Sequence, residues 1–126
     1  MFKISSNGII TVNRGDAFDF PLTLNLGSSM IHEKYNMDPT DVLYLGIMEP
    51  NQQFETAIVR KMFTYEDLDE DNNIIINFWP EDTVCLIPGK YYYQVKLERL
   101  RVDPKTQKVR TDVETVVDKT LFYIQE

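Results

Sequence analysis

The chain has 126 residues, a length that predicts a single domain, 1–126, with a core of its own. Its 20 acidic and 13 basic residues give a net charge of −7, which excludes the general attraction to phosphate backbones that nucleic-acid binding requires. Hydrophobic residues at 43% and aromatic residues at 12% exclude a disordered chain.

Short strands separated by turn residues follow one another along the whole chain. Their expected ranges are 9–13, 16–26, 41–49, 56–63, 73–79, 90–100 and 113–125, which makes about seven strands. Single helical turns are expected at 64–68 and 80–86, because Pro80 favours a helix start and Glu81 and Asp82 suit its N-terminus. We therefore expect an all-β fold.

The most regular alternation lies at 16–26. The apolar residues at every second position are Phe18, Phe20, Leu22, Leu24 and Leu26. Side chains two residues apart share one face of a strand, so we expect these five to face the core. Pro21 has no N–H to donate, which places this strand at the edge of a sheet or at a bulge.

The tripeptide Arg14-Gly15-Asp16, just before this strand, matches the one that integrins read on extracellular proteins. Gly15 permits an unusual backbone conformation, and Asp16 is a common turn residue. A tripeptide match arises easily by chance, and integrin recognition requires an exported protein. We therefore interpret the tripeptide as the turn between the strands at 9–13 and 16–26.

The segment 86–95, LIPGKYYYQV, resembles the approach to the sixth strand of immunoglobulin-like and fibronectin-type domains. In those domains a tyrosine after the turn pins a corner of the fold. The alternation leaves two registers open, and we expect Tyr91 and Tyr93 to point inward with Val95. Together with the strand count, this segment predicts an antiparallel two-sheet sandwich of the immunoglobulin or fibronectin kind.

Residues that carry chemistry are few. Cys85 has no second cysteine to pair with, and its apolar neighbours predict a small buried side chain. His32 is expected in a solvated loop, without the further ligands that zinc requires. The acidic segment 67–73 copies half of a calcium loop, but Asn72 and Phe78 replace the required glycine and glutamate, so we expect a polar turn. We expect no metal, no cofactor, no catalytic residue and hence no enzyme.

The sequence shows neither a signal peptide nor a stretch long and apolar enough to span a membrane. A single cysteine fits a reducing compartment. We therefore expect a soluble protein without a membrane partner.

Basic residues gather toward the C-terminus, where seven of the 13 fall between Lys90 and Arg110. We expect a long hairpin, 91–102 and 109–117, whose tip at 103–108 projects from the sandwich with a basic rim. It is either a solvated edge guarded by charge or a surface that docks onto an acidic neighbour or another copy of the chain. The candidate assembly contacts are Arg99, Arg101, Lys105, Lys108 and Arg110, with the apolar residues Met30, Ile31, Met37 and Phe54.

One ordered set of residues spans nearly the whole chain. It consists of Arg14-Gly15-Asp16 with Phe18, Asp41-Val42 with Tyr44 and Gly46, Ile74 and Ile76, Pro80-Glu81-Asp82-Thr83, Leu86, Gly89, Tyr91, Tyr93, Val95, Thr111, Phe122 and Ile124. This set resembles the immunoglobulin-like domain at the N-terminus of baseplate upper proteins of tailed phages, and related small virion proteins.

The resemblance implies a non-enzymatic structural protein of a phage or prophage, located in the virion after assembly in the bacterial host cytoplasm. Its partners would be other virion proteins or copies of itself, in an oligomeric assembly. The segments 28–38 and 99–110 are longer than in the family's pattern. Positions in the tail, neck, head fibre or capsid therefore stay open beside the baseplate.

A ligand-binding module, for example one that recognises a cell-surface saccharide, is the alternative on the same sandwich. Trp79 and the tyrosines supply rings on which a ligand stacks. In a binding module we expect at least two of Trp79, Tyr44, Tyr92 and Tyr123 to line one open face, whereas in a scaffold we expect them to be buried.

Overall fold

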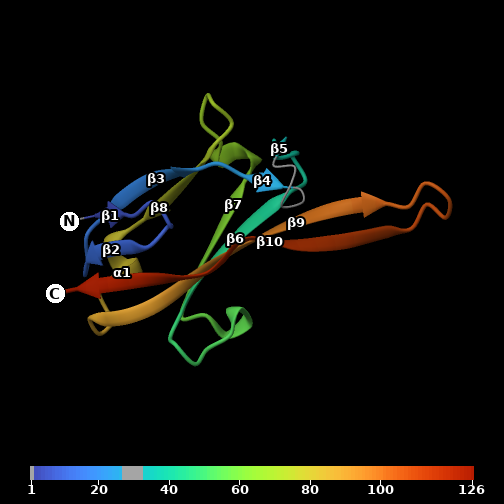
Figure 1. Ribbon diagram of the computed structural model, residues 1–126. Coiled ribbons are helices and arrows are strands. Elements are labelled where there is room, and N and C mark those ends of the chain that lie inside the picture. The colour runs from blue at the N-terminus through green and yellow to red at the C-terminus, as the bar shows by residue number, and fades with distance from the viewer. Residues whose placement is uncertain (1, 27–32) are drawn as a thin grey trace.

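The computed structural model describes residues 2–26 and 33–126 and is mostly β, with 53% in strands and 9% in helices. Within this part of the chain, six strands form a large curled sheet in the order β1-β2-β10-β9-β6-β7 (Figure 1). They are β1 Lys3–Ile4, β2 Ile10–Asn13, β6 Val42–Met48, β7 Val59–Thr64, β9 Gly89–Val102 and β10 Val109–Gln125. Two small sheets pair β3 Phe18–Leu22 with β8 Ile74–Phe78, and β4 Asn25–Leu26 with β5 Glu33–Lys34. The short helices are η1 Phe54–Thr56, η2 Tyr65–Asp67 and α1 Pro80–Thr83.

The large sheet is mixed, so the prediction of an entirely antiparallel arrangement is wrong. Its C-terminal strand β10 runs parallel to β2, with Phe122 opposite Ile10 and Ile124 opposite Val12. The physical reason is the turn after β2, which sends the chain to β3 in the other layer instead of back along β2. The edge of β2 is then free for a distant strand that runs in the same direction.

Most predicted elements lie where the sequence places them, including the helical turns at η2 and α1. The expected strand at 16–26 is divided into β3 and β4, and the short strands β1 and β5 were not predicted. Pro21 lies on β3, which pairs only with β8 among the described residues, and this confirms that it belongs to an edge strand. None of the helices in the described ranges has the length and apolar character needed to cross a bilayer.

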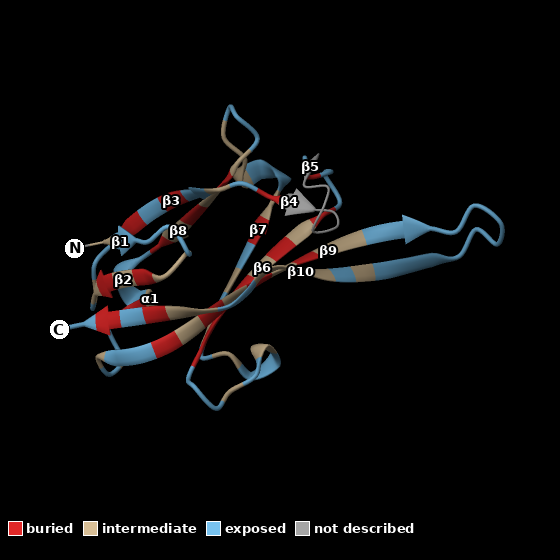
Figure 2. Ribbon diagram, viewed as in Figure 1, coloured by how far each residue is buried: buried red, intermediate tan, exposed pale blue. Residues whose placement is uncertain are grey.

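The core lies between the β3–β8 pair and the face of the large sheet that we call the inner face. Buried residues of β3 and β8 oppose each other in pairs such as Phe18 with Phe78 and Phe20 with Ile76. The Phe78 ring lies 5.7 Å, centroid to centroid, from that of Phe122 on β10, which is fully buried. This contact joins the two layers, and Figure 2 shows buried positions on the strands of both layers.

Tyr91 and Tyr93 of β9 point inward, as predicted, with exposed fractions of 7% and 5%. The Tyr91 hydroxyl donates to the Ile87 carbonyl at 2.6 Å, and the Tyr93 hydroxyl donates to the Gly8 carbonyl at 2.5 Å. Burial raises the pKa of both hydroxyls, so both remain protonated donors at neutral pH. These bonds tie β9 to the turn before it and to the turn before β2.

Arg14-Gly15-Asp16 forms the turn between β2 and β3, as the sequence predicts. Gly15 has a φ of 81°, a left-handed conformation that favours glycine. Its N–H donates to Oγ1 of the fully buried Thr83 at 2.8 Å. Arg14 forms an ion pair with Glu126 at 2.7 Å. The tripeptide therefore fixes the end of β2 to helix α1 and to the C-terminal end of β10.

Candidate assembly surface on the hairpin arm

The predicted hairpin is present and extends beyond the core (Figure 1). Strand β6 pairs with β9 only as far as Val42 opposite Glu98, so from Arg99 onward β9 has β10 as its neighbour in the sheet. We call residues 99–114 the arm. Every residue from 100 to 111 is exposed, as the pale blue ribbon in Figure 2 shows.

The tip of the arm is an ordered turn. The Asp103 N–H donates to the Lys108 carbonyl at 2.9 Å, and the Gln107 N–H donates to the Asp103 carbonyl at 2.8 Å. Gln107 has a φ of 59°. The Asp103 carboxylate accepts the Lys105 N–H at 2.8 Å, and this bond lowers the pKa of Asp103. The arm therefore ends in a defined shape and not in a loose loop.

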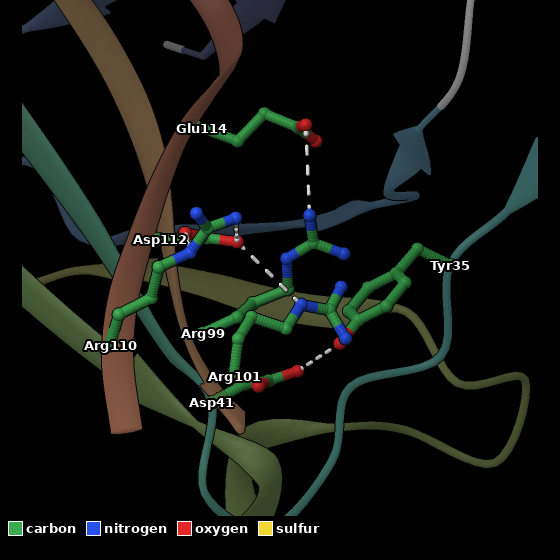
Figure 3. A network of polar contacts seen from close by, with 7 residues as sticks. All are labelled: Tyr35, Asp41, Arg99, Arg101, Arg110, Asp112 and Glu114. Carbon is green, nitrogen blue, oxygen red and sulfur yellow. Dashed lines mark hydrogen bonds and ion pairs between the residues drawn. The ribbon is translucent and has the colours of Figure 1, made fainter. Parts of the chain in front are cut away.

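One face of the arm is charged, because residues two apart on a strand share a face. Figure 3 shows its ion pairs: Arg99 with Glu114 at 3.7 Å, Arg101 with Asp112 at 3.8 Å and Arg110 with Asp112 at 2.7 Å. The first two pairs join β9 to β10, whereas Arg110 and Asp112 are two positions apart on β10. Three of the five predicted basic contacts therefore have acidic partners within the arm itself.

Because of these ion pairs, the arm is less basic along its length than the sequence predicts. Arg99 belongs to the base of the arm and not to its rim, because its side chain is only 14% exposed. Between Arg99 and Glu114 there are five basic and three acidic residues, a net charge of +2. Lys105 and Lys108 at the tip form no ion pair with the described residues. The free positive charge therefore concentrates at the tip.

The segment before β6 braces the base of the arm (Figure 3). The Tyr35 hydroxyl donates to Oδ2 of Asp41, which also accepts the Asp38 N–H at 3.0 Å. Asp41 is only 3% exposed. The Arg99 guanidinium lies 5.3 Å from the centre of the Tyr35 ring. Burial and the bond to Asp41 raise the pKa of Tyr35 to about 12, so its hydroxyl remains a donor at neutral pH.

The opposite face of the arm is apolar, which the sequence analysis missed. Its side chains are Leu100, Val102, Val109 and Val113, with exposed fractions of 49%, 56%, 63% and 61%. The signal was present in the sequence, because these residues alternate with the charged ones at 99, 101, 110, 112 and 114. The apolar face was overlooked because the number of Lys and Arg residues in a segment does not show which face of a strand they occupy.

A groove of about 400 Å³ lies where the arm joins the outer face of the large sheet. It is lined by Tyr44, Phe54, Arg60, Lys96, Glu98 and Val113, among others. Phe54 is half-buried against Gly46, where an added Cβ would lie 3.0 Å from the Phe54 ring. The Lys96 ammonium lies 4.8 Å from the centre of that ring. Of the predicted apolar contacts, Phe54 therefore lines the same groove as Val113 of the arm.

The remaining predicted apolar contacts do not reach this surface. Met37 is a core residue with an exposed fraction of 3%, so the prediction that it is exposed is wrong. Its loop folds back into the core beneath the Asp38–Asp41 turn, whose Asp41 N–H donates to the Asp38 carbonyl. Met30 and Ile31 lie outside the described residues.

The exposure of four aromatic residues distinguishes a scaffold from a binding module, and none of the four is fully buried. Trp79 is 57% exposed and Tyr123 is 36% exposed, while Tyr44 and Tyr92 are half-buried. Tyr44, Tyr92 and Tyr123 alternate with inward residues and so share the outer face of the large sheet. Lys90 and Lys119 place their ammonium groups 5.6 and 5.3 Å from the centre of the Tyr92 ring.

The other residues considered for chemistry are dispersed. Cys85 is exposed after α1, so the prediction that it is buried is wrong. His32 lies outside the described residues. Asp69 of the acidic segment accepts the N–H groups of Asp71 and Asn73, both at 2.9 Å, and forms the predicted polar turn before β8. Within 2–26 and 33–126, no three His, Cys, Asp or Glu side chains are grouped to hold a metal ion.

No family model, curated protein or solved structure matches the chain. Function therefore has to be inferred from the arm, the groove and the residues that surround them.

Proposed function

We propose that the protein is a non-enzymatic structural subunit of a phage or prophage particle, which joins neighbouring subunits through its arm. The observation that carries this proposal is the length of ordered, exposed ribbon between residues 100 and 111. Fixing a backbone residue costs about 1–2 kcal/mol, and burial is the usual compensation. A partner that covers the arm supplies this burial, and assembly into the virion in the host cytoplasm supplies the partner.

The finer fold assignment, an immunoglobulin-like sandwich, belongs to the same proposal. Two features support it: the β3–β8 pair packs on the large sheet, and Tyr91 bonds to a carbonyl four residues upstream. The segments shared with the phage family also meet, because Gly15 of Arg-Gly-Asp donates to Thr83 of Pro-Glu-Asp-Thr. Their role in this proposal is structural.

Charge favours an acidic surface as the partner of the arm. The whole chain carries −7, whereas the arm carries a net +2 with free lysines at its tip. Another copy of this chain, or another virion protein of similar charge, attracts the tip and repels the rest of the molecule. The attraction orients the arm toward its neighbour before contact, and the apolar face then supplies the buried surface.

The test is incorporation into particles of the phage or induced prophage that encodes the protein. A short-arm variant replaces residues 100–111 by Asn-Gly, which joins the opposed residues Arg99 and Asp112 through a two-residue turn. We expect mass spectrometry to detect the wild-type protein in purified virions and to find the short-arm variant depleted at least about tenfold, although it folds.

The matched control is Met62→Ser, which changes a residue that is 62% exposed on β7, outside residues 99–114 of the arm. It should be incorporated like the wild type. Virions that lack the protein would overturn the virion assignment. Equal incorporation of the short-arm variant would overturn the role of the arm.

A saccharide-binding module is the second candidate, favoured by the groove beside Tyr44 and Phe54. Burial, together with the nearby Glu98 carboxylate, raises the pKa of Tyr44, so the groove presents a neutral phenol beside a carboxylate and the cations of Arg60 and Lys96. Rings with polar neighbours suit a sugar. If this candidate holds, a screen against bacterial surface polysaccharides detects binding that Tyr44→Ala abolishes and the short-arm variant retains.

A further inference from the structure

The edge of β10 along the arm has no neighbouring strand in the described part of the chain. β9 covers one edge, and β2 covers the other only at 122–125. From Val109 to Thr115 the ladder with β9 is regular, and its register shifts begin after Thr115. This stretch contains no proline or bulge, two of the features with which proteins protect such edges. Its charged side chains are a third such feature, and they admit only a strand of complementary charge. The stretch is therefore a template for an added strand.

The direction of the backbone groups follows from the turn at the tip. The Lys108 carbonyl points toward β9, because it accepts the Asp103 N–H. Backbone groups of successive strand residues point to opposite edges. Val109, Thr111 and Val113 therefore turn their N–H and C=O groups away from β9, toward the open edge.

The sequence of this edge is complementary to itself when read antiparallel. Residues 108–114 are Lys-Val-Arg-Thr-Asp-Val-Glu. If two copies pair about a twofold axis at Thr111, Lys108 lies opposite Glu114 of the second copy and Arg110 lies opposite Asp112 of the second copy. Each charged residue then meets one of opposite sign, and the axis produces every such pair twice.

The apolar residues obey the same symmetry. Val109 lies opposite Val113 of the second copy, and Thr111 lies opposite its own counterpart. These are the residues whose backbone groups face the open edge, so the pairing forms roughly six hydrogen bonds. The backbone direction therefore permits the register that side-chain complementarity favours.

Neighbouring registers are less favourable. An axis at Asp112 places this carboxylate opposite its own copy, and an axis at Arg110 places two guanidinium groups opposite each other. Like charges directly opposite on paired strands are destabilising. An axis at Val113 places Asp112 opposite Glu114 of the second copy, twice. Charge therefore specifies the axis at Thr111 among the registers that the backbone allows.

We infer that the arm pairs with the arm of a second copy of this chain, antiparallel along β10 and centred on Thr111, to form a four-stranded ribbon β9-β10-β10-β9. The inference rests on the proposed function, because it names the partner of the arm. The contact is closed, since the same edge serves both copies. The ribbon also joins the apolar faces of the two arms into one surface.

The size of the contact determines its strength. Seven paired residues extend over roughly 23 Å of strand, less surface than the ~800 Å² per partner of a standard interface. We expect a dissociation constant between roughly 10 μM and 1 mM for the isolated protein. Many copies held side by side in a particle would raise the local concentration above this range.

The test of the charge pattern uses two variants, each of which should dimerise weakly alone and more strongly when the two are mixed. In Lys108→Glu the end pairs become Glu with Glu, and in Glu114→Lys they become Lys with Lys. We expect each variant to dimerise about tenfold more weakly than the wild type in sedimentation equilibrium. In an equimolar mixture each end pair between the two copies again joins opposite charges, and the double variant Lys108→Glu/Glu114→Lys restores opposite end pairs between two identical copies. Dimerisation equal in all variants would overturn the inference.

The test of the register uses cysteine cross-linking in a Cys85→Ser background, because Cys85 is exposed. Thr111→Cys should form a disulfide dimer on mild oxidation, since opposed hydrogen-bonded residues have Cα atoms about 5.5 Å apart, within the range for disulfides. Val109→Cys should not, because it lies about 13 Å from its own copy, but it should cross-link with Val113→Cys. Cross-linking of Val109→Cys with itself, or none at position 111, would overturn the register.

The outcomes separate the inference from the proposed function. If Lys108→Glu enters virions normally while the short-arm variant does not, the arm assembles with another protein and the self-pairing is wrong. If the wild type dimerises with the expected register but is absent from virions, the pairing stands and the virion assignment fails.

Discussion

Replacement of Phe122 by alanine is expected to lower the free energy of unfolding by about 3–5 kcal/mol, measured by urea denaturation. Phe122 is fully buried on β10, and its ring lies 5.7 Å from that of Phe78 and 6.3 Å from that of Tyr93. Phe78 continues the stack to Phe18 at 4.7 Å. Truncation therefore leaves a cavity between the two layers.

The matched control is the next residue. Tyr123→Ala removes a ring that is 36% exposed on the outer face, and we expect a loss below about 1 kcal/mol. A domain of this size has a free energy of unfolding of roughly 5–15 kcal/mol, so the Phe122→Ala variant should still fold, with a small but measurable free energy of unfolding. A loss of less than about 1.5 kcal/mol would show that the layers do not depend on this contact.

Two-residue alternation was sufficient to predict the longer strands that have one buried face, but not the two-residue strands β1 and β5. β8, with Ile74, Ile76 and Phe78 inward, and β9, with Tyr91 and Tyr93 inward, show this directly. The two-residue alternation identifies a strand and its buried face, but it does not identify the strand with which it pairs. The parallel pairing of β2 with β10 depends on residues more than a hundred positions apart, which no local pattern contains.

The arm was predicted from its charges, but its chemistry depends on which side chains share a face. Arg99 and Arg101 read as free cations in the sequence, whereas the register places Glu114 and Asp112 beside them. Met37 looked like a loop residue, yet its chain folds back into the core. In each case a contact between distant segments decides the role of the residue.

Replacement of Asp41 by alanine is expected to lower the free energy of unfolding by about 2–4 kcal/mol and to loosen the base of the arm. The 3% exposed carboxylate accepts the Tyr35 hydroxyl and the Asp38 N–H, and both donors lose their partner in the variant. Tyr35 then no longer holds its ring under the Arg99 guanidinium. Urea denaturation measures the stability, and amide hydrogen exchange at 99–102 measures the arm.

The control Asp41→Asn retains an acceptor oxygen of the same shape, so we expect less than about half of the loss. The two effects are separable, because the arm extends past the core and begins after Glu98, the last residue of β9 that pairs with β6. In Asp41→Ala the pKa of Tyr35 should also fall from about 12 toward 10.0, which tyrosinate absorbance detects. If stability falls but exchange at 99–102 does not rise, Asp41 supports the loop before β6 and the ion pairs with Glu114 and Asp112 hold the arm without it.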